Sequence, residues 1–234
     1  MKFCIFISLH SQSKYKISHL FAEAIQVWRC KPQISQGHLG GRDGSNSCTL
    51  IAIIPGRMFC LSESELAIPN QNSNPLKNSW VHALANAIVD GNTVYDKNIL
   101  NQQIPPACYL DVETACTLAR KEFKIATVNE PLPVWFQDSD DSPLATIDYQ
   151  LFLFSLKKGT HCSILTSNGK WSVILSEGKG KLFLIDTHYD ILSGSGSKFV
   201  LGNAQGVSEF IRKKARQFTK KLRYGVLTML EFLS

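Results

Sequence analysis

The chain has 234 residues, of which 44% are hydrophobic and 19% are charged. This composition excludes a disordered chain and is typical of a globular protein with one core. The formal net charge is +6, and much of the basic excess lies in residues 212–223. We interpret that run as the solvated face of a C-terminal helix, so nucleic acid is not an expected partner.

The cysteines are scattered along the chain without a CxxC pair. This pattern argues against a disulfide framework and against a structural zinc site, so neither a metal nor another cofactor is expected. Free thiols predict a reducing intracellular compartment, the cytoplasm or the nucleus. The apolar opening, residues 1–9, is at the short limit for a signal peptide and lacks a cleavage site, so we interpret it as a first strand. No later apolar run is long enough to cross a membrane, and no membrane association is expected.

Residues 1–35 are predicted to form an N-terminal extension that contains a strand and a helix. Apolar residues recur at helical spacing across residues 18–30, and Pro32 ends that pattern. Residues 36–234 then form the main domain. It begins with a glycine-rich loop, residues 36–47, which the apolar run 49–54 follows. Glycines permit close backbone approach, and the apolar run predicts a buried helix that Cys48 opens.

The middle of the chain is predicted to be helical. Residues 80–89 carry an apolar face at helical spacing, and Asp111 is placed to cap a helix that runs to Arg120. The acidic loop 137–143 marks the main boundary, because the periodicity changes there from helical to extended.

An antiparallel sheet is predicted after that boundary. Asn168-Gly169 joins two of its strands and is a strong hairpin signal. A glycine and serine loop at 193–197 leads to a last helix, 205–221, and a final strand, 224–232. The strand candidates of the meander are residues 149–156, 161–167, 171–176 and 181–187. Helices followed by an antiparallel sheet predict the α+β class.

Cys48 has the sequence setting of a catalytic nucleophile. At a helix N-terminus the unpaired N–H groups and the macrodipole favour the thiolate. Its own N–H would point toward the oxyanion that forms when a carbonyl is attacked, and Gln36, across the loop, can supply a side-chain amide as the second donor. A buried cysteine that opens an apolar helix is, taken alone, more often a core residue, so the interpretation depends on its partners.

Asp186 and His188 are the expected partners of that thiol. They stand two residues apart at the end of a predicted strand, where alternate residues share a face. The carboxylate can orient the imidazole, which can take the thiol proton and later give it to the leaving amine. A glutamine, a glycine-rich loop, a cysteine-headed helix and a late DxH pair together match the requirements of acyl transfer.

His161 is a rival for the role of base. It begins a predicted strand at the place where papain carries its histidine, and there it would pair with Asp186 and leave His188 as a substrate contact. We favour His188 because the DxH pair needs no long-range assumption. The His161 assignment would suit a Cys-His-Asp amidase or a transglutaminase-like enzyme, in which the histidine usually precedes the aspartate.

These motifs resemble the deubiquitinating proteases related to the herpesvirus large tegument protein, which are papain-like cysteine proteases. The resemblance rests on Gln36-Gly37, on residues 44–49 and on residues 185–188, and it covers the chain from Gln36 to the last strand. It implies a papain-like fold, in which a helical lobe packs its nucleophile helix on an antiparallel β-sheet. Thr187 stands where these enzymes often have proline or serine. The resemblance assigns the nucleophile, base, orienting carboxylate and oxyanion donor to Cys48, His188, Asp186 and Gln36.

The same resemblance implies hydrolysis of isopeptide or peptide bonds after the C-terminal glycine of ubiquitin, with ubiquitin or polyubiquitin as the partner. Two alternatives stay open: a protease for a ubiquitin-like modifier, and a catalytically silent ubiquitin-binding module. A ubiquitin tail carries two arginines, which acidic side chains would bind. The candidates are Asp43, Asp138, Asp140 and Asp141, of which the last three also suit a solvated loop.

Overall fold

The computed structural model describes residues 25–61, 66–70, 75–137, 143–218 and 224–233. Within these residues an eight-stranded sheet has the order β1-β7-β6-β5-β4-β8-β2, and β3 pairs with β8. All of these pairings are antiparallel. The strands are β1 (Gln26–Arg29), β2 (Ile125–Val128), β3 (Leu132–Trp135), β4 (His161–Ser167), β5 (Lys170–Ser176), β6 (Leu182–Asp186), β7 (Lys198–Gly202) and β8 (Tyr224–Phe232).

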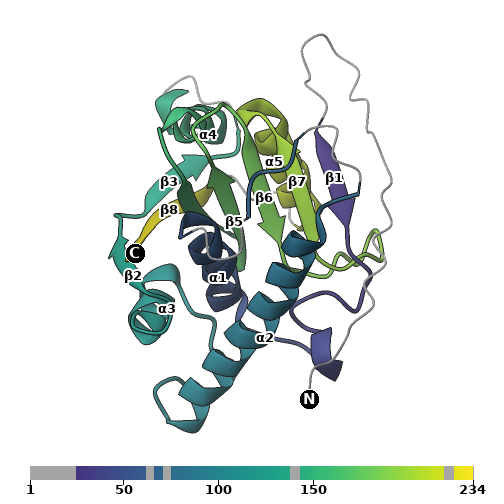
Figure 1. The fold of residues 1–234 in the computed structure, drawn as a ribbon, viewed down its shortest axis with the longest axis vertical. Helices are drawn as coiled ribbons and strands as arrows, with labels where there is room; N and C mark the ends of the chain where they lie inside the picture. The colour runs from purple at the N-terminus through teal and green to yellow at the C-terminus, as the bar shows by residue number, and fades with distance from the viewer. Residues whose placement is uncertain (1–24, 62–65, 71–74, 138–142, 219–223, 234) are drawn as a thin grey trace.

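Helices lie on both faces of the sheet (Figure 1). The helices are α1 (Cys48–Cys60), α2 (Asn78–Leu100), α3 (Val112–Ala119), α4 (Ile147–Leu156) and α5 (Ala204–Phe218), with short 3-10 turns η1 (Leu39–Gly41) and η2 (Pro143–Ala145). Side-chain alternation along each strand divides the core into two layers. On β6, Phe183 and Ile185 pack in the layer of α1, α2 and α3, whereas Leu182 and Leu184 pack in the layer of α4 and α5.

Two glycines allow the close packing that fixes α1. A Cβ atom on Gly56 would lie 2.2 Å from the sulfur of Cys162, so α1 lies directly against β4. A Cβ atom on Gly91 would lie 2.6 Å from Cγ1 of Ile51, so α2 lies directly against α1. The helix that begins at Cys48 is therefore held from two sides.

Much of the predicted order is confirmed. The glycine-rich loop leads into α1 at Cys48, and α2 and α3 occupy the middle of the chain. The Asp111 side chain caps α3 by accepting a 2.7 Å hydrogen bond from the backbone of Thr114. Asn168 and Gly169 have φ angles of 51° and 67°, as the tight turn of a two-residue hairpin requires. The α+β class is confirmed as well.

Two predicted elements are wrong. Residues 149–156 lie in helix α4 and not in a strand, because Thr146 caps the helix at Tyr149 and the buried side chains recur at helical spacing, at Ile147, Leu151 and Phe154. The helix predicted over residues 18–30 is wrong from residue 25 onward, since Gln26–Arg29 form β1. The residues before 25, including the predicted first strand, lie outside the described part of the chain.

Strands β2, β3 and β7 have no counterpart among the predicted elements. Each has only four or five residues, too few for a clear alternating pattern. β7 stands between the loop at 193–197 and the last helix, and it pairs with both β6 and β1. Strand β1 comes from the segment predicted as an N-terminal extension and adds to the edge of the central sheet.

Candidate active site

Asp186 and His188 are in direct contact at the end of β6. Oδ1 of Asp186 lies 2.7 Å from Nδ1 of His188 and accepts a second hydrogen bond, 3.2 Å long, from the His188 backbone N–H. The carboxylate side chain is 1% exposed and the imidazole 11% exposed. Because Nδ1 faces Asp186, Nε2 is the ring nitrogen that a thiol could use.

Cys48 is the first residue of α1, and its side chain is 1% exposed. The next residue, Thr49, anchors this end of the helix by donating a 2.5 Å hydrogen bond from its hydroxyl to the carbonyl of Leu110. Cys48 is therefore almost fully covered by its neighbours in this conformation. In the preceding loop Gly40, Gly41 and Gly44 have positive φ, a conformation that glycine adopts without strain.

Lys170, on β5, interacts electrostatically with Cys48 and with Asp190, a residue of the segment after His188. Burial lowers the pKa of its ammonium group, and the negative charges of Asp190 and of a Cys48 thiolate oppose that shift. Asp190 follows His188 by two residues. The nucleophile candidate and the segment after His188 therefore act on the same cation.

Gln36 connects the loop before Cys48 with the DxH segment. Its backbone N–H donates a 3.0 Å hydrogen bond to the carbonyl of Thr187. In its side chain, Nε2 donates to the carbonyl of Ser45 at 3.3 Å, and Oε1 accepts from the Thr187 hydroxyl at 2.8 Å. The structure thus brings Gln36 to the two chain segments that carry Cys48 and His188.

Asn92, a buried residue of α2, was not a candidate in the sequence and yet holds three groups of the site. Its Oδ1 accepts hydrogen bonds from the hydroxyls of Ser45 (2.7 Å) and Ser47 (2.6 Å), and its Nδ2 donates to the carbonyl of Gln36 (3.2 Å). The sequence does contain an indication of this role, because Asn92 is a polar residue on the mostly apolar buried face of a helix.

Lys214, on α5, forms an ion pair with Oδ2 of Asp186. Its side chain is only 18% exposed, so the prediction of a solvated basic face is wrong at this position. Burial, together with the nearby Lys170, lowers the pKa of Lys214 to about 7. Lys214 follows the inward-facing Ile211 by three residues, a spacing that places it on the buried side of the helix.

His161 lies at the other end of the sheet from Asp186. It pairs with Ser176, which pairs with Leu182, whereas Asp186 pairs with Ser172. Four residues of strand separate the two positions, roughly 13 Å at 3.3 Å per residue. Nε2 of His161 instead lies 2.6 Å from the carbonyl of Lys158. The alternative in which His161 pairs with Asp186 is therefore not what the structure shows.

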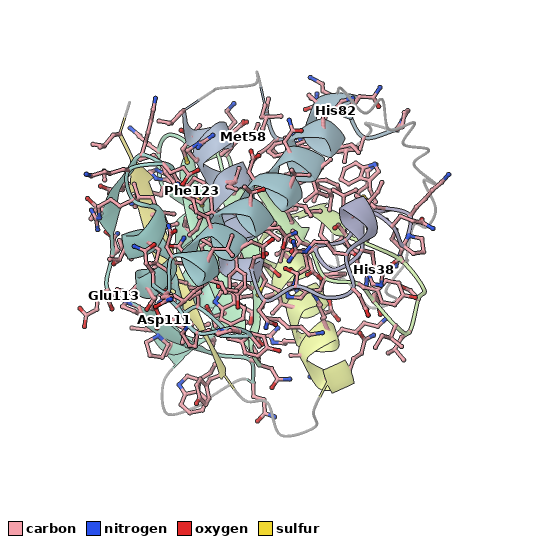
Figure 2. All side chains as sticks on the ribbon, turned by 90° about the horizontal axis from the view of Figure 1, so that it is seen from below. His38, Met58, His82, Asp111, Glu113 and Phe123 are labelled. Atoms are coloured by element: carbon pink, nitrogen blue, oxygen red, sulfur yellow. The ribbon has the colours of Figure 1, made fainter. Side chains whose placement is uncertain are left out.

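The structure describes only some of the residues that were predicted to contact substrate. Asp43 is exposed in the loop before Cys48, while Asp138, Asp140 and Asp141 lie outside the described residues. His38, in the same loop, packs against Tyr189 with ring centroids 5.1 Å apart and the rings tilted by 56°. Figure 2 shows His38 on the opposite side of the molecule from Asp111 and Glu113.

Membrane-spanning helices and clusters of potential metal ligands are both absent from the described ranges. None of the helices there is both long and apolar enough to cross a membrane. The His, Cys, Asp and Glu side chains of those ranges form no group of three or more that could hold a metal ion.

Comparison with known proteins finds similarity at the level of the fold. No family model matches the chain, and no curated protein matches its sequence. Among solved structures, the ubiquitin-specific protease encoded by the murine cytomegalovirus tegument protein M48, in complex with a ubiquitin-based suicide substrate, matches with a TM-score of 0.53 and 11% identity. The match covers 89% of this chain and 86% of that chain. The chain therefore has an α+β fold similar to that of a viral ubiquitin-specific protease.

Proposed function

We propose that this protein is a thiol-dependent deubiquitinase with a papain-like fold, which hydrolyses bonds after the C-terminal glycine of ubiquitin. The observation that carries the proposal is the 2.7 Å contact between Asp186 and His188, linked through Gln36 to the loop that ends at Cys48. The fold similarity to a protease captured with a ubiquitin-based substrate supports the choice of ubiquitin.

In the proposed mechanism, Nε2 of His188 takes the proton of the Cys48 thiol, and Asp186 stabilises the resulting imidazolium. The thiolate sulfur attacks the carbonyl carbon, and the oxyanion accepts hydrogen bonds from the Cys48 backbone N–H and from Nε2 of Gln36. His188 then protonates the leaving amine, which leaves a thioester. Water, activated by His188, hydrolyses the thioester and releases the ubiquitin carboxylate.

The test is covalent labelling with a ubiquitin suicide probe, followed by intact mass and peptide mapping. We expect one probe adduct on Cys48, and none in Cys48→Ala. Cys60 and Cys108, the partly exposed thiols among the described cysteines, supply matched controls, so Cys60→Ala and Cys108→Ala should label like the wild type. Labelling of another cysteine, or activity that survives in Cys48→Ala, would overturn the proposal.

The same assay separates the two alternatives. Parallel probes that carry ubiquitin-like modifiers would identify a protease for such a modifier by faster labelling than ubiquitin gives. A silent module would bind ubiquitin in a titration but would form no adduct. The thiol of Cys48 is 1% exposed, so labelling should be followed for hours as well as minutes.

A further inference from the structure

We infer that Thr187 is a positioning residue that orients the Gln36 side-chain amide as an oxyanion donor. This inference rests on the proposed function, because it concerns the donor that the proposed reaction needs. The contact behind it is the 2.8 Å hydrogen bond that the Thr187 hydroxyl donates to Oε1 of Gln36. Both side chains are buried, with 1% and 8% of their surface exposed.

The neighbours of the Gln36 amide determine which of its ends is nitrogen. The carbonyl of Ser45, 3.3 Å away, can only accept a hydrogen bond, so the nitrogen must face it. The oxygen then faces Thr187, whose hydroxyl can donate. In the flipped amide two carbonyl oxygens would face one another, and the Nε2 protons would point away from the loop that precedes Cys48.

The backbone of Gln36 is held independently of its side chain. Its N–H donates to the carbonyl of Thr187, and its carbonyl accepts from Nδ2 of Asn92. Loss of the Thr187 hydroxyl therefore leaves the Gln36 Cα in place and frees only the amide rotation. The second proton on Nε2, beyond the one given to Ser45, is the one available to an oxyanion.

This arrangement gives Thr187, the middle residue of the DxH segment, a role in positioning the oxyanion donor. Asp186 and His188 serve the thiol, while Thr187, on the other face of the chain, serves the oxyanion donor. A serine at this position would keep the hydroxyl, whereas valine has the same shape without it. The two substitutions therefore separate the hydrogen bond from packing.

The experiment compares hydrolysis of a ubiquitin–coumarin conjugate with alkylation of Cys48 by iodoacetamide. In alkylation the thiolate sulfur forms a bond to the CH2 carbon and iodide leaves, so no oxyanion develops. We expect Thr187→Val to lower kcat about tenfold with KM nearly unchanged, and Gln36→Ala to lower it about 100-fold. Both variants should be alkylated at the wild-type rate, whereas Asp186→Asn should be alkylated more slowly.

Two further variants make the inference specific. Thr187→Ser should restore kcat to within about twofold of the wild type. In the Gln36→Ala background, Thr187→Val should have no further effect, because the amide it orients is gone. Thr187→Ala, which also lacks the hydroxyl, replaces the valine variant if that protein does not fold.

The outcomes separate the two claims. If the wild type is alkylated at Cys48 but does not hydrolyse the conjugate, the proposed function is wrong and the inference falls with it. If the wild type hydrolyses it and the hydroxyl-free variants keep their kcat, only the inference is wrong. Equal losses of hydrolysis and alkylation in Thr187→Val would also overturn it, because they would indicate damage to the thiol and not to the oxyanion donor.

Discussion

The carboxylate of Asp186 divides its two oxygens between two partners, His188 and Lys214. Gln36 likewise divides its amide between Ser45 and Thr187. Side chains with two partners have few rotamers left, and this restriction holds the imidazole and the amide in one orientation each. At the scale of residues, the site is thus held by contacts from outside the Cys-His-Asp set.

Single substitutions test the choice between His188 and His161 as the catalytic base. We expect His188→Ala to lower kcat/KM for a ubiquitin–coumarin conjugate by about 10³-fold or more, because the thiol loses its base. His161→Ala is the matched control, and its kcat/KM should stay within about twofold of the wild-type value. His161 is the first residue of β4 and contacts the carbonyl of Lys158, far from Asp186. A larger loss in His161→Ala than in His188→Ala would reverse the assignment.

Helix α2 acts on the site through one buried side chain. We predict that Asn92→Ala lowers the free energy of unfolding by about 2–3 kcal/mol, because two hydroxyls and one carbonyl each lose a buried hydrogen bond. Urea titration measures this loss, and kcat should fall as well, since both Gln36 and the loop before Cys48 are released.

Asn98 on the same helix supplies the control for Asn92. It is similarly buried, but its Nδ2 donates to the carbonyl of Val94, one turn earlier in the same helix α2. Asn98→Ala should therefore reduce stability by about 1 kcal/mol and leave kcat unchanged. If both variants keep full kcat, Asn92 is structural only.

Helix α5 carries a lysine whose pKa of about 7 makes stability depend on pH. Between about pH 7 and the ordinary lysine pKa, the unfolded chain binds more protons at Lys214 than the folded chain, so stability rises with pH. From pH 7 to pH 8.5 we expect a contribution on the order of 1 kcal/mol. Urea unfolding of Lys214→Met should lack this rise.

Lys179 is the control for Lys214. Its side chain is 76% exposed and pairs with Glu177 on the surface, so Lys179→Met should keep the wild-type dependence on pH. A rise of the same size in Lys214→Met would show that another group causes it.

At the scale of the whole molecule, the core layer that contains α1, α2 and α3 buries thiols and so disfavours their ionisation in the folded state. Burial raises the pKa of Cys30 and of Cys116 to about 12, above the ordinary value of 9.0. A raised folded pKa gives stability that is complete below pH 9 and is lost as pH rises toward 12. We expect a loss of about 1 kcal/mol per thiol at pH 10.

This alkaline loss is measurable by urea unfolding at pH 8.5 and pH 10. Cys30→Ala and Cys116→Ala should each show a smaller loss between these values than the wild type, whatever their stability at pH 8.5. The rise due to Lys214 continues into this range with the opposite sign. It is common to the wild type and both thiol variants, so the difference between them reports the thiols alone. An unchanged loss in both variants would contradict the prediction.

Local patterns in the sequence predicted the parts of the fold that depend on neighbours along the chain. The loop-to-helix junction at Cys48, the Asp111 cap and the Asn168-Gly169 hairpin each follow from a few adjacent residues. The strand predicted over residues 149–156 is wrong, because an apolar run without a strict period suits both a strand and a buried helix. In the sequence, the Thr146 cap is the signal that favours the helix.

The sequence by itself determined that Asp186 and His188 could meet, since they stand only two residues apart where a predicted strand ends. Only the tertiary structure decided which other groups reach them. Sheet register separated His161 from Asp186, helix α5 placed Lys214 beside Asp186, and α2 brought Asn92 to the loop of Gln36 and Ser45. These contacts join residues far apart in the chain, and their partners are set by packing, for which a single sequence carries no local pattern.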